Sequence, residues 1–67
     1  GSAELVIPDD FLAALEMRPE ARAFFETLGR ADRFAVYFRL HTAKRPETRD
    51  RRMAMILNKL DRRERLV

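Results

Sequence analysis

Apolar residues return every three or four positions over four separate stretches of this chain, which is the spacing of helices that bury one face. The first stretch follows Pro8-Asp9-Asp10 and places three apolar side chains on one face: Phe11, Leu12 and Leu15. An aspartate at a helix start accepts hydrogen bonds from free backbone N–H groups and suits the positive helix end. We therefore expect the first helix to begin at residues 8–10.

The second stretch begins at Pro19, where the missing proline N–H costs nothing in a first helical turn. Its apolar residues also share one side: Ala21, Phe24, Phe25 and Leu28. Gly29 follows directly, and glycine tolerates the left-handed conformation that commonly ends a helix. The pattern predicts a second helix that ends at Gly29 in that conformation.

The third stretch, residues 31–43, carries two apolar stripes on different sides of the predicted helix. The first stripe consists of Phe34, Tyr37, Phe38 and His41, and the second of Val36 and Leu40. An apolar surface this wide is typical of a helix with neighbours on two sides. We therefore expect the third helix to be the central one.

The fourth stretch lies within residues 43–65, which we expect to form one basic, amphipathic helix. Pro46 and Glu47 suit its first turn, and Met53, Ile56, Leu57 and Leu60 follow the i, i+3, i+4, i+7 spacing of a buried seam. Only residues 5–7 have the character of an extended segment. The four stretches predict an all-α fold, a small compact bundle of three to four helices, with the fourth helix packed across the third.

The length of 67 residues sets the domain count at one. Gly1-Ser2 has the character of a tag remnant, so we assign the domain to residues 3–67. The absence of cysteine excludes a disulfide, a thiolate metal site and a cysteine nucleophile. We expect no metal and no cofactor, because one histidine supplies too few ligands. No apolar run reaches the roughly 18 residues of a membrane span, so we expect a cytoplasmic protein.

Charge is divided unevenly along the chain. Residues 1–43 contain five basic and seven acidic residues, a net charge of −2, whereas residues 44–67 contain nine basic and four acidic residues, a net charge of +5; the two sum to the formal net charge of +3. The basic face of the last helix is therefore the predicted partner-binding surface. Its candidate residues are Lys44, Arg45, Arg49, Arg51, Arg52, Lys59, Arg62 and Arg63.

Arg49 differs from the other candidates because helical spacing places it beside the apolar seam. A half-buried guanidinium needs an acceptor, so we favour an ion pair with a carboxylate of the same domain, such as Asp50, Glu26 or Asp32. Anchoring a partner is the alternative. Among the other basic residues, Arg52, Lys59 and Arg63 are the preferred contacts for a partner.

No residue pattern points to catalysis. His41 is the only histidine, and it lies on an apolar stripe without a carboxylate at helical spacing, so a packing or surface role is preferred to that of a general base. Asp9 and Asp10 point about 100° apart on a helix, so they do not converge as a catalytic pair. We expect a protein that is not an enzyme.

The basic face also suits phosphate groups, which makes nucleic-acid binding the alternative function. The second and third predicted helices, joined around Gly29, have the order of a helix-turn-helix. However, the third helix carries Phe34, Val36 and Phe38, whereas a recognition helix presents polar side chains to base edges. A merely solvated helix face and a membrane-surface helix are the remaining interpretations, and we favour protein docking.

Residues 43–52 read AKRPETRDRR, and this string resembles the most recognisable motif of the bacteriocin-protection, YdeI/OmpD-associated family. The segment from Ile7 to Asp10 with Ala14-Leu15 resembles the opening of the family, and the second stretch resembles its second helix. The resemblance implies a role against bacteriocins or envelope stress, and it implies no catalytic residues. Members often carry this helical domain behind a small β-barrel, so the resemblance also implies such a domain of the same parent chain as a partner.

Overall fold

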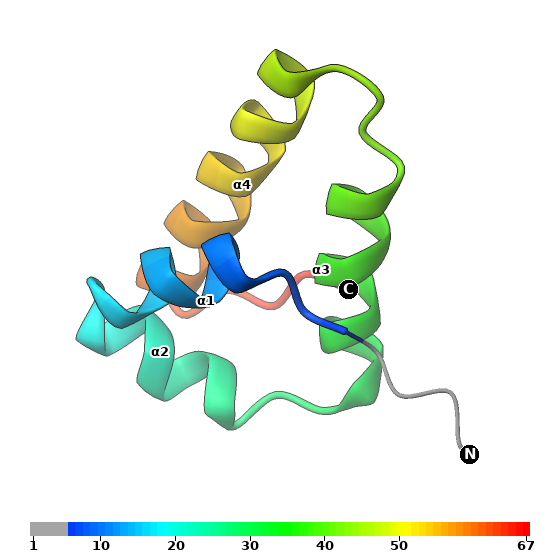
Figure 1. The fold of residues 1–67 in the computed structure, drawn as a ribbon. Helices are drawn as coiled ribbons and strands as arrows, with labels where there is room; N and C mark the ends of the chain where they lie inside the picture. The colour runs from blue at the N-terminus through cyan, green and yellow to red at the C-terminus, as the bar shows by residue number, and fades with distance from the viewer. Residues whose placement is uncertain (1–5) are drawn as a thin grey trace.

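The computed structural model describes residues 6–67, and these form four helices joined by short loops (Figure 1). The helices are α1 (Asp9–Glu16), α2 (Pro19–Glu26), α3 (Arg30–His41) and α4 (Pro46–Asp61). No strand occurs within residues 6–67, so the prediction of a small all-α bundle is confirmed. The interpretation of Gly1-Ser2 as a tag remnant lies outside the described residues.

The helix starts follow the local sequence signals. Pro19 and Pro46 occupy the first helical positions of α2 and α4, as predicted. In α1 the Asp10 carboxylate accepts a hydrogen bond from the Phe11 N–H at 2.9 Å. This N–H belongs to the first turn and has no partner within the helix, so the aspartate satisfies it.

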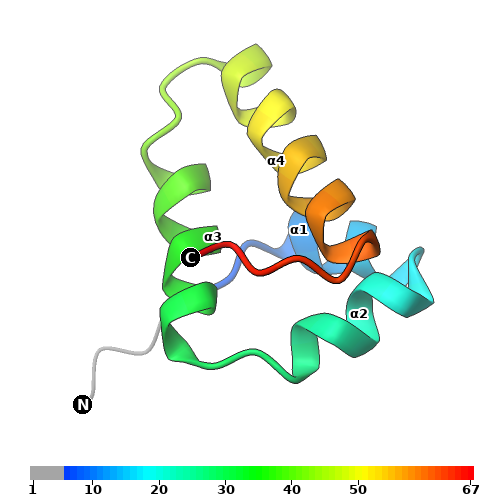
Figure 2. The ribbon, with the colours of Figure 1, turned by 180° about the vertical axis from the view of Figure 1, so that it is seen from behind.

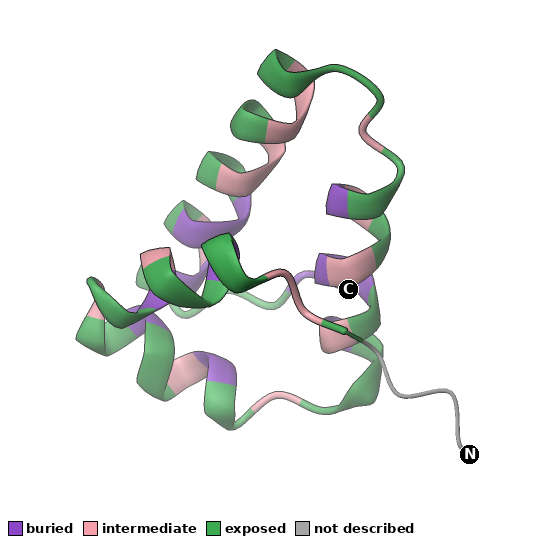
Figure 3. Ribbon diagram, viewed as in Figure 1, coloured by how far each residue is buried: buried purple, intermediate pink, exposed green. Residues whose placement is uncertain are grey.

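The hydrophobic core lies where the inner faces of the four helices meet (Figure 3). Its buried apolar residues are Phe11, Leu15, Ala21, Phe25, Ala35, Val36, Leu40, Ile56, Leu57, Leu60 and Leu66. The Phe11 and Phe25 rings meet edge to face with their centroids 5.8 Å apart. The predicted seam of α4 is thereby confirmed: Ile56, Leu57 and Leu60 are buried, and Met53 is partly buried against the same core.

The central helix is α4 and not α3, so the predicted arrangement is wrong in this respect. Helix α4 packs against both α2 and α3, and α1 packs against α2. Figures 1 and 2 show α3 at one side of the bundle, opposite α1 and α2. Only the Val36 and Leu40 stripe of α3 is buried, while Phe34 and Phe38 remain 48% and 52% exposed. A chain this short provides no further helix among its described residues to cover the second stripe.

The end of α2 also differs from the prediction. The helix ends at Glu26, and Gly29 has φ −87° and ψ −168°, an extended conformation, as the residue before α3. The last carbonyls of α2 are satisfied by side chains instead: the Thr27 hydroxyl donates to the Phe24 carbonyl at 2.7 Å, and Arg33 donates to the Phe25 carbonyl at 3.5 Å. A left-handed glycine cap is therefore unnecessary there.

Helix α4 ends at Asp61, four residues earlier than the predicted limit at residue 65. The Glu64 N–H donates to the Lys59 carbonyl at 2.9 Å, and the Arg63 N–H donates to the Leu60 carbonyl at 3.0 Å. These two bonds form a Schellman motif, and they require a left-handed residue between them. That residue is Arg63, with φ 57°, and the chain then turns back as the C-terminal tail (residues 62–67).

We expect Arg63→Gly to stabilise the domain by about 1 kcal/mol, because glycine adopts the left-handed conformation without steric cost. The measurement is the midpoint of urea unfolding followed by circular dichroism. Arg62→Gly is the matched control, since Arg62 has φ −89° and gains nothing from glycine. A loss of stability in Arg63→Gly would show that the arginine side chain contributes more than the backbone strain costs.

Candidate functional site

The predicted basic residues do not form one free surface, because several are used within the fold. Arg49 donates two hydrogen bonds to the Asp10 carboxylate, at 2.6 Å and 3.0 Å, and joins α4 to α1. The hydrogen bond from Arg49 lowers the pKa of Asp10 below its ordinary value. The preferred internal ion pair is therefore present, but the carboxylate is none of the three that the sequence proposed. Asp10 lies 39 positions from Arg49 and on another helix, so only the tertiary fold brings the two side chains together.

Arg52 and Arg62 also have intramolecular partners. Arg52 donates to the Arg39 carbonyl at 2.9 Å and to the Thr42 hydroxyl at 3.0 Å. The carbonyls at the end of α3 have no partner within their helix, so Arg52 caps α3 from the neighbouring helix. Arg62 pairs with Glu64, with Nε 3.0 Å from the nearest carboxylate oxygen.

The other five predicted residues form the α4 basic surface, defined as Lys44, Arg45, Arg51, Lys59 and Arg63. Within residues 6–67, none of these side chains makes a hydrogen bond or an ion pair shorter than 4 Å. Lys59 has only a longer-range effect, which adds to the hydrogen bond from Arg62 in lowering the pKa of Glu64. These cations remain available for an external anion.

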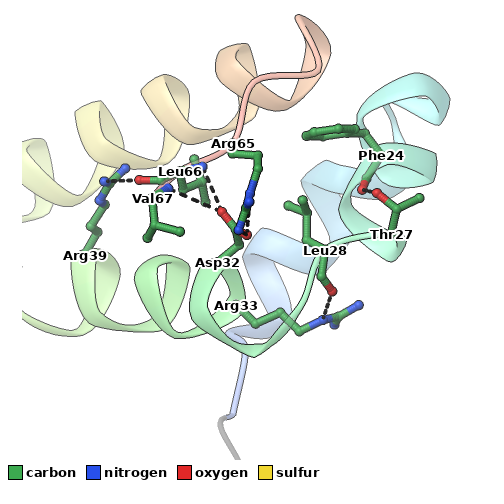
Figure 4. Close-up of polar contacts among 9 residues, drawn as sticks. All are labelled: Phe24, Thr27, Leu28, Asp32, Arg33, Arg39, Arg65, Leu66 and Val67. Carbon is green, nitrogen blue, oxygen red and sulfur yellow. Dashed lines mark hydrogen bonds and ion pairs between the residues drawn. The ribbon is translucent and has the colours of Figure 1, made fainter.

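Asp32 is a buried acidic residue that the sequence analysis named only as a candidate partner of Arg49. Its carboxylate accepts hydrogen bonds from the Leu66 N–H at 2.9 Å, the Val67 N–H at 3.3 Å and the Arg65 guanidinium at 3.0 Å and 3.2 Å (Figure 4). One signal was present in the sequence: Asp32 precedes Val36 by four residues, so it shares the buried stripe of the helix.

Burial alone would raise the pKa of Asp32, because it disfavours the charged form. The hydrogen bonds from the Leu66 N–H and from Arg65 outweigh burial, and the pKa lies below its ordinary value. Asp32 is therefore ionised at neutral pH, beneath the tail that supplies its donors. Burial of this carboxylate is tolerated because both of its oxygens are satisfied.

The tail is held against α3 from a second point. The Arg39 guanidinium donates to the Leu66 carbonyl at 2.8 Å, and the Leu66 side chain is buried in the core. Figure 2 shows the tail crossing from the end of α4 to α3. Beside it runs an open groove, lined by Phe24, Thr27, Leu28, Gly29, Asp32, Arg63 and Arg65. The only acid in this lining is already neutralised by Arg65, so the free charge at the groove is that of Arg63.

His41 is exposed, and its ring stacks on that of Tyr37 with 5.1 Å between the centroids. This placement agrees with a surface role. Residues 6–67 contain no group of three or more histidine, cysteine, aspartate or glutamate side chains arranged to hold a metal ion. Over the same residues, no helix combines the length and the apolar character that a membrane span requires.

Comparison with known proteins gives one match. The sequence profile described as bacteriocin-protection, YdeI or OmpD-associated covers residues 4–63. No curated protein and no solved structure matches the chain. The matched region includes all four helices and the motif at residues 43–52, which agrees with the resemblance seen in the sequence. The chain therefore belongs to the bacteriocin-protection, YdeI or OmpD-associated family.

Proposed function

We propose that this domain is a non-enzymatic interaction module that docks an acidic protein partner through the α4 basic surface. The observation that carries the proposal is that, within residues 6–67, none of its five cations makes a hydrogen bond or an ion pair. Within residues 44–67, Glu47 and Asp50 are the acidic side chains without an ion pair, so positive charge remains in excess. Such an excess attracts an acidic partner and raises its rate of association.

The surface also has an apolar centre. Met55 is 59% exposed on α4, and Arg51 and Lys59 lie four residues before and after it, on the same side of the helix. Methionine and arginine are both enriched in protein interfaces, where apolar contacts are surrounded by polar ones. The exposed methionine between Arg51 and Lys59 therefore favours a protein-docking surface over a helix face that is merely solvated.

Family membership suggests a role in bacteriocin protection, and docking of a partner is our proposal for how the domain takes part in it. Nucleic acid is the alternative ligand of the same surface, because the same cations would contact phosphates. The two hypotheses predict different results when the captured material is treated with nuclease. A protein partner survives nuclease treatment, whereas a nucleic acid does not.

The test is affinity capture from a lysate of the organism that encodes the protein, with mass spectrometry of the captured proteins. We expect the double variant Arg51→Glu with Lys59→Glu to lose at least about 90% of a nuclease-resistant partner, since each like charge facing the partner costs about 1 kcal/mol or more. Circular dichroism should remain that of the wild type, because neither side chain has an ion partner among residues 6–67.

Single variants provide a matched comparison. Arg51→Glu and Arg22→Glu change the net charge equally, but Arg22 lies on α2 and pairs with Glu26. Arg22→Glu should retain the partner and Arg51→Glu should weaken its capture. Equal capture by both single variants and by the double variant would contradict the proposal. Capture that nuclease abolishes would favour the nucleic-acid alternative.

A further inference from the structure

A second surface lies on α3, opposite the stripe that this helix buries. We define it as the α3 aromatic face, which consists of Phe34, Tyr37, Phe38 and His41. The rings of Phe34 and Phe38 stack at 5.8 Å between centroids, and those of Tyr37 and His41 at 5.1 Å. Phe34 and Phe38 are nevertheless about half exposed, at 48% and 52%. The face is therefore a contiguous group of rings in contact with water.

Helix α3 is held to the bundle from its other side, by the buried Val36 and Leu40 side chains and by the bonds that Asp32 and Arg39 make to the tail. Two phenylalanines at such exposure leave apolar area in contact with water. Burying that area against a partner would stabilise the complex. Contiguous exposed apolar groups of this kind mark interaction sites.

Charge indicates which partner fits. The one acidic residue of α3 is Asp32, and it is completely buried, so the charged side chains that reach solvent from this helix are basic. Arg33 and Arg39 donate to backbone carbonyls, which do not neutralise their charge, and Lys44 follows the last turn. A second copy of the chain would bring one positively charged helix against another. A partner with an apolar stripe and acidic flanks matches both features.

Single-stranded nucleic acid fits this face less well. Bases stack on exposed ring faces, whereas these rings stack pairwise on one another. Contact with a run of phosphates also needs several free cations along the face, and the guanidinium groups of Arg33 and Arg39 already donate to the Leu28 and Leu66 carbonyls. The observations therefore favour a protein segment.

We propose that the α3 aromatic face docks an amphipathic helix of a protein partner, with apolar residues toward the rings and acidic residues at its edges. Phe34, Phe38 and His41 recur along one side of α3 at the spacing that helix-to-helix docking uses. Helix α3 has 12 residues, which gives a contact length of about 18 Å, or three turns. This proposal concerns a different helix from α4, and of the α4 basic surface it uses only Lys44, which follows the end of α3.

The probe is a synthetic peptide of about 18 residues, long enough to form helix, with leucine at i, i+3, i+4 and i+7 positions and glutamate elsewhere. Amide chemical shifts of the isotope-labelled domain locate the peptide. The fluorescence of Tyr37 reports on the face itself, because the chain has one tyrosine and no tryptophan. We expect saturable binding, with the shift changes centred on α3.

The double variant Phe34→Ser with Phe38→Ser should raise the dissociation constant of the peptide by about tenfold or more, because aromatic anchors dominate such contacts. Phe38→Glu is a second variant, which keeps the Phe34 ring and places a negative charge that repels the acidic peptide. Met55→Ser is the matched control, an equally exposed apolar side chain on α4, and it should change the dissociation constant by less than about twofold. Arg51→Glu should likewise leave the peptide bound.

Three outcomes would overturn this proposal. In the first, the Phe34 and Phe38 variants bind as the wild type does, while Arg51→Glu loses the peptide. In the second, a peptide with lysine in place of glutamate, or a single-stranded oligonucleotide, binds the face more tightly. In the third, sedimentation shows a concentration-dependent dimer that Phe38→Glu dissociates, which would assign the face to a second copy. Unchanged capture of the partner by the α4 variants would contradict only the proposed function and would leave the α3 proposal standing.

Discussion

Replacing Asp32 by alanine is expected to lower the free energy of unfolding by about 2–4 kcal/mol, a large part of the stability of a domain this small. The change removes the acceptor of the Leu66 and Val67 N–H groups and of Arg65. The tail then loses its attachment to the first turn of α3, and the Leu66 side chain is exposed with it. Urea unfolding followed by circular dichroism at low temperature measures the loss.

Arg65→Ala is the control for this prediction. Arg65 is 62% exposed, so water replaces the hydrogen bonds that its guanidinium loses, and Asp32 keeps its two backbone donors. We therefore expect a loss below about 1 kcal/mol. An equal loss in both variants would mean that the ion pair, and not the buried backbone contacts, holds the tail.

The same carboxylate gives a pH dependence of known sign. The pKa of Asp32 is lower in the folded protein than its ordinary value of 3.8. Its contribution is therefore fully present above about pH 4 and is lost as the pH falls through the folded pKa. The stability difference between the wild type and Asp32→Asn should shrink below pH 4. A difference that stays constant down to pH 2 would contradict the ionised state of this group.

The second large effect is a difference in stability between variants of Phe11 and Phe38. Both residues lie on apolar stripes of the sequence. Phe11→Ala is expected to cost about 3–5 kcal/mol, because Phe11 is completely buried and its ring contacts Phe25. Phe38→Ala is expected to cost less than about 1 kcal/mol, because the ring is 52% exposed before the change. The urea midpoints of the two variants provide the comparison, with identical chemistry at both sites.

This pair also tests which helix is central. If Phe38→Ala cost as much as Phe11→Ala, α3 would have neighbours on both sides, as its sequence predicts. If Phe11→Ala were mild, the contact between α1 and α2 would contribute little to the core. The expected result is a large difference, with the greater cost at Phe11.

The sequence predicted elements well because the signals for them are local. A proline at the start of α2 and of α4, and apolar residues at helical spacing in α4, depend on neighbours within a few positions. Predictions of helix ends were poorer, since the end of a helix depends on which groups satisfy its last carbonyls. Thr27 and Arg33 do so for α2 by donating to the Phe24 and Phe25 carbonyls, and Arg33 lies in α3.

The candidate site likewise has some features that the sequence predicted and others that depend on how the helices pack. The excess of basic residues after Ala43 was evident from composition, and five of the eight predicted residues have no hydrogen-bond or ion-pair partner in the described part of the chain. That Arg49 would pair with Asp10, and that Arg52 would cap α3, depended on residues brought together across 39 and 10 or 13 positions. No spacing rule connects such residues before the helices pack.

By itself, the sequence determined the all-α class, the family, the four helical segments and the concentration of positive charge near the C-terminus, because each depends on composition or on local periodicity. Only the tertiary structure decided that α4 is central, that Asp32 is buried under the tail, and that the α3 aromatic face remains in water. An apolar stripe shows that a residue can be buried, but the number of neighbouring helices decides whether it is. In this chain α3 carries two such stripes, and the described fold covers only one.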